Sequence, residues 1–391
     1  MRILIVAPYC SLPEEPYFNR FLQLAEMLCE RHEVILVTSR FRHHDKSMRL
    51  SFDQRRAQKI ERFSIVLIDE PGYVSNVSLR RVYSHGVFFK NFKLWFEATW
   101  IESRVDVIYS AYPLISTNIY LGRIKKKYGF KLFLDVQDVW PESIASVLPV
   151  LRHVNPRLLP FSSKADDAYR GADFLLAVSH TYMRRAKLVN SRAASKVVYI
   201  GCDRAQLDAA HIHKFEDQFL NFVYIGTLSH SYDLKTVVKG FAKIWRDDRI
   251  KAFLHILGDG PDRGSLEEIS TPNIKFYGFL KYSEMLSFLK GADGCINALS
   301  VGAQQTITNK FCDYALSGKC IINSQTNAEV LRVLENFSHV NYAAGSVDSF
   351  VDAIDQSISA PPVSMKANVL REFDRSVSYP ALIDFIEYHG R

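Results

Sequence analysis

The segment Ile307–Asn323 reads ITNKFCDYALSGKCIIN, and its residue order predicts a helix followed by a strand. Thr308 and Asn309 have side chains that commonly cap a helix N-terminus. Gly318 is typical of a helix end, because glycine adopts the left-handed conformation there without strain. The apolar run Cys320–Ile322 then predicts a short buried strand. A helix that leads directly into such a strand is typical of an α/β fold.

Lys310 and Asp313 are three residues apart, so the sequence places both on one face near the N-terminal end of this helix. That end carries free backbone N–H groups and partial positive charge, which favour a bound phosphate. The Asp313 carboxylate cannot bind phosphate, but it can accept hydrogen bonds from hydroxyl groups on the molecule that carries the phosphate. The pattern therefore indicates a nucleotide-sugar site. The alternative is a solvated Lys–Asp pair on an ordinary helix.

Length and composition predict a globular protein of two domains, since 391 residues exceed one usual hydrophobic core. The net charge of +7 favours an anionic partner. Zinc-finger spacings and RNA-binding aromatic motifs do not occur, so no nucleic-acid partner is expected. The six cysteines form no C-x-x-C pair, which favours reduced thiols in a cytoplasmic protein and argues against a zinc site. We expect neither a signal peptide, because strand pattern begins at Arg2, nor a membrane-spanning segment.

Strand-like runs alternate with helical ones, which predicts two parallel α/β sheets. The expected strands of the first half are Ile3–Ala7, Val34–Thr38, Ile65–Ile68, Val107–Tyr109, Leu132–Asp135, Phe174–Val178 and Val197–Ile200. The pattern lapses at Cys202–Gln218, interpreted as the interdomain linker. It resumes at Phe222–Ile225, Phe253–Leu257, Ile274–Tyr277, Gly294–Asn297, Cys320–Ile322 and Val340–Tyr342. We therefore expect two Rossmann-like domains, residues 1–202 and 203–375, facing each other across a ligand-binding cleft, with a closing helix over residues 376–391 near the first.

The first loop, Pro8–Phe18, reads PYCSLPEEPYF and contains no glycine. A dinucleotide-binding enzyme carries a glycine-rich turn here, where the backbone approaches a pyrophosphate. A nicotinamide or flavin oxidoreductase is therefore disfavoured. Arg20, near the start of the next helix, is interpreted either as a cleft residue that binds the acceptor or as a surface arginine.

The segment Arg80–Arg104 is rich in aromatic residues, which nearly share one broad helical face. A basic helix with exposed aromatic side chains binds well to an anionic bilayer surface. The alternative is an ordinary buried helix of the first domain, since large aromatic faces usually belong to the core.

The stretch Asp135–Ser143 reads DVQDVWPES and follows a predicted strand, so its side chains are expected at the ligand-binding edge of the sheet. Asp138 and Glu142 are two carboxylates on either side of Trp140. Their functional interpretation is hydroxyl recognition or acid/base chemistry. The alternative is a capped turn with Glu142 in the first turn of a helix.

Two strand ends in the second half point to phosphate binding. Gly226 and Thr227 end the strand before a helix that carries Lys235, whose charge can neutralise a pyrophosphate. Gly258 and Gly260 in the sequence LGDGP are expected to let the chain approach a ligand closely.

The order of four motifs resembles the group-1 (family 4) retaining glycosyltransferases of the GT-B fold. These motifs are GTL followed by lysine, LGDGP, YGFL at Tyr277–Leu280, and TNKFCDYALSGKCII. DVQDVWPES also resembles a stretch of the bacterial branch of this family that assembles surface polysaccharides. The resemblance covers nearly the whole chain and is strongest over residues 130–145 and 220–325.

The resemblance implies an activity and a set of roles. The enzyme would move a sugar from a nucleotide-sugar, with a UDP-sugar favoured, to a lipid-linked saccharide acceptor at the inner membrane face. No metal or other cofactor is implied, and no D-x-D motif occurs. The expected catalytic residues are Asp138, Lys235 and Asp313. The expected donor-binding residues are Gly226, Thr227, Lys235, Gly258, Asp259, Gly260, Thr308, Asn309, Lys310 and Asp313. The expected acceptor-binding residues are Arg20, Trp140 and Glu142.

Three departures from the family pattern concern the donor sugar more than the nucleotide. Thr227 stands where many members have arginine, and the two glutamates of the family's E-x7-E pattern are replaced by Gln305 and Asp313. The glycine-rich first loop is also missing. Two other functions therefore remain: another GT-B sugar-nucleotide enzyme such as a 2-epimerase, and a non-catalytic sugar-nucleotide-binding subunit of an assembly complex.

Overall fold

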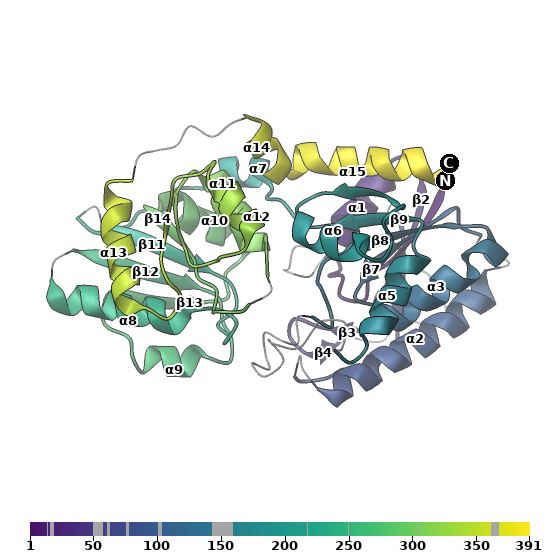
Figure 1. Ribbon diagram of the computed structural model, residues 1–391, viewed down its shortest axis with the longest axis horizontal. Helices are drawn as coiled ribbons and strands as arrows, with labels where there is room; N and C mark the ends of the chain where they lie inside the picture. The colour runs from purple at the N-terminus through teal and green to yellow at the C-terminus, as the bar shows by residue number, and fades with distance from the viewer. Residues whose placement is uncertain are drawn as a thin grey trace. The chain divides into compact units, whose positions relative to one another are not determined.

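The computed structural model describes residues 1–13, 15, 19–49, 58–60, 63–75, 78–100, 104–142, 159–216, 218–248, 250–303, 305–360 and 367–391 (Figure 1). These residues divide into two compact units. The first comprises the described parts of Met1–Ile144, His153–Val198 and Tyr379–Arg391. The second comprises the described parts of Tyr199–Ser378.

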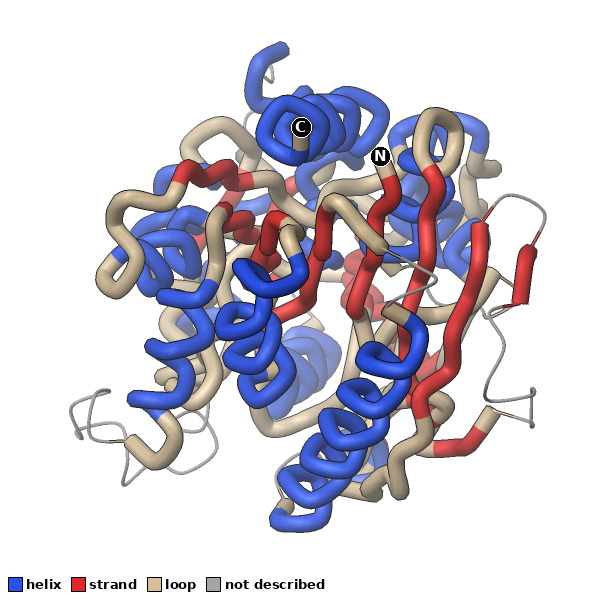
Figure 2. The backbone as a smooth tube through the Cα atoms, turned by 90° about the vertical axis from the view of Figure 1, so that its right-hand side faces the viewer, coloured by secondary structure: helices blue, strands red, loops and turns tan. Residues whose placement is uncertain are grey.

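The first unit is built on an eight-stranded sheet in the order β10-β9-β8-β7-β1-β2-β6-β5 (Figure 2). Its strands are β1 Arg2–Val6, β2 Glu33–Ser39, β5 Gln58–Ile60, β6 Phe63–Ile68, β7 Val107–Tyr112, β8 Lys131–Val136, β9 Phe174–Ala177 and β10 Ala194–Val197. All neighbouring pairs are parallel except β5 and β6. A separate hairpin pairs β3 Phe41–Arg42 with β4 Ser47–Met48. The central strands are continuous apolar runs, as expected of a parallel sheet covered on both faces.

Helices cover both faces of this sheet. The helices of the first unit are α1 Arg20–Leu28, α2 Leu79–Thr99, α3 Ile115–Tyr128, α5 Ser162–Gly171, α6 His180–Lys187 and, from Tyr379 onward, α15 Arg375–Gly390. One core joins Leu24 of α1 and Leu382 of α15 to Ile3 and Ile5 of β1. A second core packs α2 and α3 on the other face.

Three phenylalanines of α2 belong to this second core, whereas Tyr83 of the same helix is exposed. Phe88, Phe92 and Phe96 are 0%, 0% and 2% exposed, and Trp100 follows them into the core. The interpretation of Arg80–Arg104 as a helix with an exposed aromatic face is therefore wrong for these residues. The structure shows the alternative, burial in the core, for this face of α2, while Leu79, Tyr83 and Leu94 of the helix are 89%, 64% and 59% exposed.

The second unit contains a six-stranded parallel sheet in the order β13-β12-β11-β14-β15-β16. Its strands are β11 Leu220–Ile225, β12 Ala252–Leu257, β13 Ile274–Gly278, β14 Gly294–Asn297, β15 Cys320–Asn323 and β16 His339–Asn341. Its helices are α7 Arg204–Ala209, α8 Leu234–Asp247, α9 Arg263–Glu267, α10 Tyr282–Gly291, α11 Asn309–Ser317, α12 Ala328–Leu334, α13 Val347–Ile358 and α14 Ala367–Phe373. This arrangement, one parallel-sheet α/β unit after another, confirms the predicted fold class.

One predicted strand is misplaced. Val197–Ile200 was expected as a strand, but β10 ends at Val197. The apolar residues that follow β10 are buried without forming a strand. Val198 packs into the core of the first unit, and the Tyr199 ring stacks on that of Phe373 at 4.9 Å. The boundary between the units falls between these two residues, ahead of the polar segment interpreted as a linker, which itself contains α7. None of the described helices is long and apolar enough to cross a membrane.

Candidate functional site

The helix predicted from the opening segment is α11, and its ends lie where the sequence placed them. Thr308 is the N-cap, and its side-chain oxygen accepts a hydrogen bond from the backbone N–H of Phe311. Gly318 ends the helix with φ of 73°. Asn309 is exposed at the first turn, while Lys310 is buried beneath it.

Lys310 is a buried cation with an aromatic setting. Its side chain is only 6% exposed, and Nζ donates a hydrogen bond of 3.0 Å to the Tyr224 hydroxyl. The same nitrogen lies 3.6 Å from the centre of the Tyr232 ring and 4.2 Å from that of Tyr224. Within the described part of the chain, no carboxylate forms an ion pair with it. Burial lowers the pKa of the Lys310 ammonium well below its ordinary value, as expected for a desolvated charge without a counter-ion.

Buried polar atoms without partners surround the start of the same helix. Among the residues that the structure describes, the Oγ1 atom of Thr306, a residue 1% exposed, and the Oε1 atoms of Gln305 and Gln325 have no hydrogen-bond partner. Gln325 follows β15 and donates a 3.4 Å hydrogen bond to the Thr306 carbonyl. Buried polar groups in folded proteins are nearly always satisfied, so these atoms require a hydrogen-bond partner from water or from a polar ligand.

The glycine turns after β11 and β12 pack against each other. Gly226 donates to the Leu257 carbonyl at 2.9 Å, and Leu228 donates to the Asp259 carbonyl at 3.0 Å. A Cβ on Gly258 would lie 1.9 Å from the Gly226 carbonyl oxygen, and one on Gly260 would lie 2.3 Å from that of Leu228. The sequence analysis predicts that these glycines let the chain approach a ligand closely. In the structure their close neighbours are the backbone of the adjacent turn.

Replacement of Gly258 by alanine is therefore expected to lower the free energy of unfolding by about 1–3 kcal/mol, because its φ of 149° is also unfavourable for alanine. Urea denaturation followed by circular dichroism measures this. Gly264→Ala is the matched control, since among the described residues no atom apart from its chain neighbours and its own helix backbone lies within 4 Å of its added Cβ. It should leave stability unchanged or raise it. Equal losses in both variants would contradict the packing explanation.

Of the other donor-site candidates, Gly226 and Thr227 lie beside Lys310: a Cβ on Gly226 would lie 3.7 Å from Lys310 Nζ, and the Thr227 carbonyl accepts a 2.9 Å hydrogen bond from the Tyr224 hydroxyl. Asp313 is 5% exposed and accepts a 2.8 Å hydrogen bond from the Tyr282 hydroxyl, and burial raises the pKa of its carboxyl to about 6. Lys310 and Asp313 therefore contact different tyrosines, although they lie three residues apart on one helix. Lys235 is exposed in the first turn of α8, and Thr227 is exposed after β11. The exposed Asp259 side chain contacts Arg263 and the Gly260 N–H.

In the first unit, Arg20 forms part of the core. It is 3% exposed, its Nε donates to Asp135 Oδ2 at 2.9 Å, and its Nη1 donates to the Val198 carbonyl at 2.9 Å. Tyr109 donates to the same carboxylate oxygen at 2.8 Å. The interpretation of Arg20 as a surface residue is wrong, and its role as an acceptor-binding residue stays a prediction.

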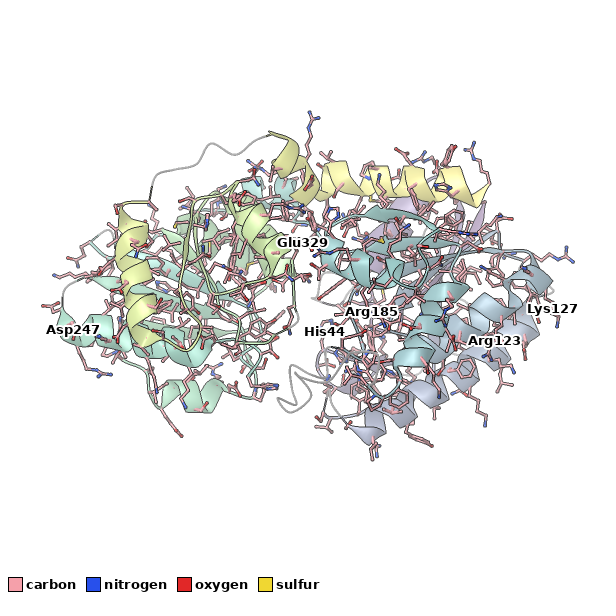
Figure 3. The ribbon with its side chains drawn as sticks, in the orientation of Figure 1. His44, Arg123, Lys127, Arg185, Asp247 and Glu329 are labelled. Carbon is pink, nitrogen blue, oxygen red and sulfur yellow. The ribbon has the colours of Figure 1, made fainter. Side chains whose placement is uncertain are left out.

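The predicted site residues of the DVQDVWPES stretch lie in different surroundings. Glu142 forms an ion pair with Arg185, which also contacts Asp166 Oδ1 at 2.8 Å. Figure 3 labels Arg185. Asp138 and Trp140 are both half-buried. The Asp138 carboxylate accepts a 2.8 Å hydrogen bond from the Val139 N–H, and the Trp140 ring lies 5.4 Å from that of Phe161.

Three tyrosines that the sequence interpretation missed shape the second-unit site: Tyr224, Tyr232 and Tyr282. Tyr224 is the penultimate residue of the buried strand β11 and Tyr232 precedes α8, and such positions alone are a weak signal of function. Nothing in the sequence relates them to Lys310, which is 86 residues away from Tyr224.

Residues 220–360 match the family model described as Glycosyl transferases group 1. This match lies wholly within the second unit, whose α11 and glycine turns it includes. The domain assigns the enzyme class, glycosyltransferase. No match was found among curated protein sequences.

Solved structures resemble the chain over nearly its full length. The α,α-trehalose-phosphate synthase (UDP-forming) from Burkholderia vietnamiensis matches with a TM-score of 0.73 and 10% identity, over 100% of this chain and 97% of its own. The lipopolysaccharide outer core galactosyltransferase WaaB matches with a TM-score of 0.62 and 16% identity, over 100% of both chains. Anabaena HepE in complex with UDP-glucose matches with a TM-score of 0.63 and 13% identity, over 99% and 100%. At such identities the similarity establishes the GT-B fold.

Proposed function

We propose that this protein is a retaining glycosyltransferase that moves a sugar from a UDP-sugar to a lipid-linked saccharide during assembly of a bacterial surface polysaccharide. It would act in the cytoplasm, at the inner face of the membrane, without a metal ion. The observation that carries the proposal is Lys310, a buried ammonium group without a carboxylate partner in the described residues, at the N-terminus of α11.

A buried cation without a counter-ion is costly in the free protein. A diphosphate at the N-terminus of α11 would remove that cost, because it would bring negative charge to the ammonium group and to the free helix N–H groups. The orphaned atoms of Thr306, Gln305 and Gln325 are suited to the hydroxyl groups of the attached sugar. Together these features favour a sugar diphosphate over a simple phosphate.

The chemistry follows from the same geometry. Departure of the nucleoside diphosphate places negative charge on the phosphate oxygens, and a fixed cation stabilises this charge better than water does. Tyr224 and Tyr232 hold the Lys310 ammonium group in place. Retention follows from the family resemblance: the acceptor hydroxyl attacks from the face that the diphosphate leaves, and the phosphate takes its proton. Asp138 would position the sugar or acceptor.

A UDP-sugar and a glycan acceptor are supported by the similar structures, which include a UDP-glucose complex and a lipopolysaccharide galactosyltransferase. A UDP-GlcNAc 2-epimerase also shares the fold. The group 1 domain over residues 220–360 favours transfer over epimerisation.

The proposal is tested by measuring binding and turnover of a panel of UDP- and GDP-sugars in the presence of EDTA. We expect one UDP-sugar to be used, with slow hydrolysis alone and faster release of UDP when a lipid-linked saccharide is added. Epimerised donor without acceptor would indicate the epimerase. Tight binding without turnover would indicate a non-catalytic subunit, and no binding of any nucleotide-sugar would overturn the proposal.

A further inference from the structure

Three neighbouring strands of the second unit each end in asparagine. Asn297 is the last residue of β14, Asn323 that of β15 and Asn341 that of β16, and the three are paired with one another in the register of the parallel sheet. Asparagine is depleted in β-strands, yet Asn297 and Asn323 are both 0% exposed. Sheet stability alone therefore does not account for this set of three residues, which we call the asparagine row.

The side chains of the asparagine row are hydrogen-bonded in series. Asn297 Nδ2 donates to Asn323 Oδ1 at 2.9 Å, and Asn323 Nδ2 donates to Asn341 Oδ1 at 2.8 Å. Asn323 is also bonded to the backbone two residues later: its Oδ1 accepts from the Gln325 N–H at 3.1 Å, and its Nδ2 donates to the Gln325 carbonyl at 3.0 Å. The Asn323 amide thus uses both of its N–H donors and both lone pairs of its oxygen. Because hydrogen bonds in such a series strengthen one another, the turn after β15 is held firmly.

The turn that Asn323 holds carries a side chain of the candidate donor site. Gln325 lies in this turn, is 5% exposed and donates from Nε2 to the Thr306 carbonyl at 3.4 Å. Thr306 lies two residues before the N-cap of α11. A second link runs through Ser324, whose Oγ accepts from the Leu299 N–H at 2.7 Å and donates to the Leu299 carbonyl at 2.9 Å. The asparagine row therefore connects the ends of β14 and β15 to the residues that lead into α11.

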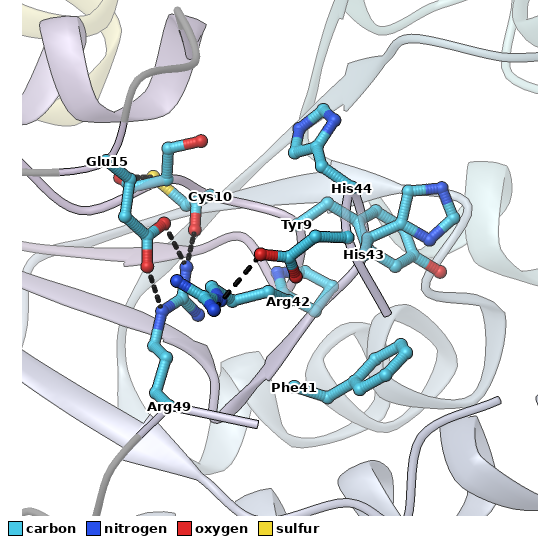
Figure 4. Close-up of a pocket in the computed structure, with 11 residues that line it drawn as sticks. Tyr9, Cys10, Glu15, Phe41, Arg42, His43, His44 and Arg49 are labelled. Atoms are coloured by element: carbon cyan, nitrogen blue, oxygen red, sulfur yellow. Dashed lines mark hydrogen bonds and ion pairs between the residues drawn. The ribbon is translucent and has the colours of Figure 1, made fainter. Parts of the chain in front are cut away.

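The amide oxygens around this turn still need hydrogen-bond donors. In the first unit, by comparison, Glu15 and Arg49 beside the pocket in Figure 4 satisfy each other with two hydrogen bonds of 2.7 Å. The Asn297 Oδ1, Gln305 Oε1 and Gln325 Oε1 atoms are buried and have no such partner in the described ranges. An amide oxygen can only accept, so the water or ligand that completes these atoms has to donate an O–H or N–H. Sugar hydroxyl groups are donors of this kind.

We propose that Asn323 is a positioning residue for recognition of the donor sugar. Through the turn after β15 it fixes the Gln325 amide oxygen where a hydroxyl group of the sugar donates to it. Asn323 does not contact the nucleotide-sugar itself, because its own hydrogen-bonding positions are all occupied. The inference rests on the proposed transferase function and adds to it the residue on which discrimination between donor sugars depends.

The test compares the dissociation constants of UDP, UDP-glucose, UDP-galactose and UDP-N-acetylglucosamine, measured by isothermal titration calorimetry on the full chain. We expect the wild type to bind one of the three UDP-sugars more tightly than the others. Asn323→Ala should reduce this selectivity about threefold to tenfold, the effect of misplacing one hydrogen bond. It should change the affinity for UDP less than twofold, because Lys310, the proposed diphosphate contact, is not bonded to the asparagine row.

Asn273→Ala is the matched control for a purely structural role. Asn273 is likewise 0% exposed, and its Nδ2 donates to the carbonyls of Phe241 and Ala252 at 3.1 and 2.9 Å. It lies directly before β13, at the end of the sheet opposite the candidate site. This variant should lower the melting temperature, as Asn323→Ala does, and leave the selectivity between UDP-sugars at the wild-type value.

Asn297→Ala is a milder variant, since it removes only the 2.9 Å hydrogen bond to Asn323, and it takes the place of Asn323→Ala if that protein does not fold. The proposal is overturned if the variant keeps the wild-type selectivity, if Asn273→Ala loses as much, or if UDP loses as much affinity as the UDP-sugars. Equal affinity of the wild type for all three UDP-sugars would also overturn it, although the proposed transferase function would then survive. Failure of that function gives a different result: the wild type would bind neither UDP nor any UDP-sugar, and both proposals would fall.

Discussion

Lys310→Met is expected to reduce kcat/KM for the nucleotide-sugar by about 100-fold or more while making the free protein more stable. The loss follows because a preorganised cation that meets charge on the departing diphosphate contributes about 10²–10³ in rate. The gain follows because methionine fills a similar volume without a buried charge. Steady-state UDP release and urea denaturation of the same two proteins measure the two effects.

The pH dependence of this gain identifies its cause. The folded-state pKa of Lys310 lies below its unfolded value, so the unfolded chain binds the proton more tightly and wild-type stability increases with pH. The advantage of Lys310→Met should therefore be largest at low pH and shrink as the pH approaches the ordinary lysine pKa of about 10.4. A gain that is independent of pH would indicate better packing instead of a removed charge.

Lys235→Met is the matched control, since the sequence interpretation gives the pyrophosphate to that lysine. Lys235 is exposed, and an exposed charge acts through water with a high dielectric constant. We expect a smaller loss of kcat/KM, about tenfold at most, and no gain in stability. A larger loss of kcat/KM in Lys235→Met than in Lys310→Met would mean that the exposed lysine makes the principal phosphate contact.

Local signals in the sequence were sufficient to predict the sheets and α11. Val34–Thr38 and Phe253–Leu257 are apolar runs between polar turns, and they lie within β2 and β12. Thr308 and Gly318 determine the two ends of α11 through their own side-chain and backbone preferences. In each case the deciding contacts lie within a few residues along the chain.

Contacts between residues far apart in the sequence could not be predicted from it. The position of the Lys310 amino group depends on its hydrogen bond to Tyr224. The need for glycine at position 258 depends on the close approach of the Gly226 backbone. Arg20 is buried because Asp135, 115 residues later, accepts its hydrogen bond. The aromatic pattern of α2 is equally compatible with a core and with a membrane surface, and only the packing against β6 and α3 decides between them.

Asp313→Asn is expected to stabilise the protein at pH 7.5 by up to about 3 kcal/mol. Burial raises the pKa of this carboxyl from 3.8 to about 6, and each pKa unit corresponds to about 1.4 kcal/mol. Because the folded state holds the proton more tightly, the wild type loses stability as the pH rises from about 4 through about 6. The asparagine variant carries no such charge and can still accept the Tyr282 hydrogen bond. The free energies of the two proteins should therefore converge below pH 4, which urea titrations at several pH values would show.

The same variant separates a structural role of Asp313 from contact with the nucleotide. If the carboxylate accepts hydrogen bonds from the ribose, as the family resemblance implies, Asp313→Asn should weaken UDP binding about tenfold, because bonds to charged groups contribute about 1.5–3 kcal/mol. Tyr282→Phe is the control: it removes the 2.8 Å hydrogen bond while keeping the charge. It should raise the Asp313 pKa further and lower stability at pH 7.5. Unchanged UDP affinity in Asp313→Asn, together with the predicted stability gain, would mean that this carboxylate serves the interior of the second unit and that nucleotide recognition lies elsewhere.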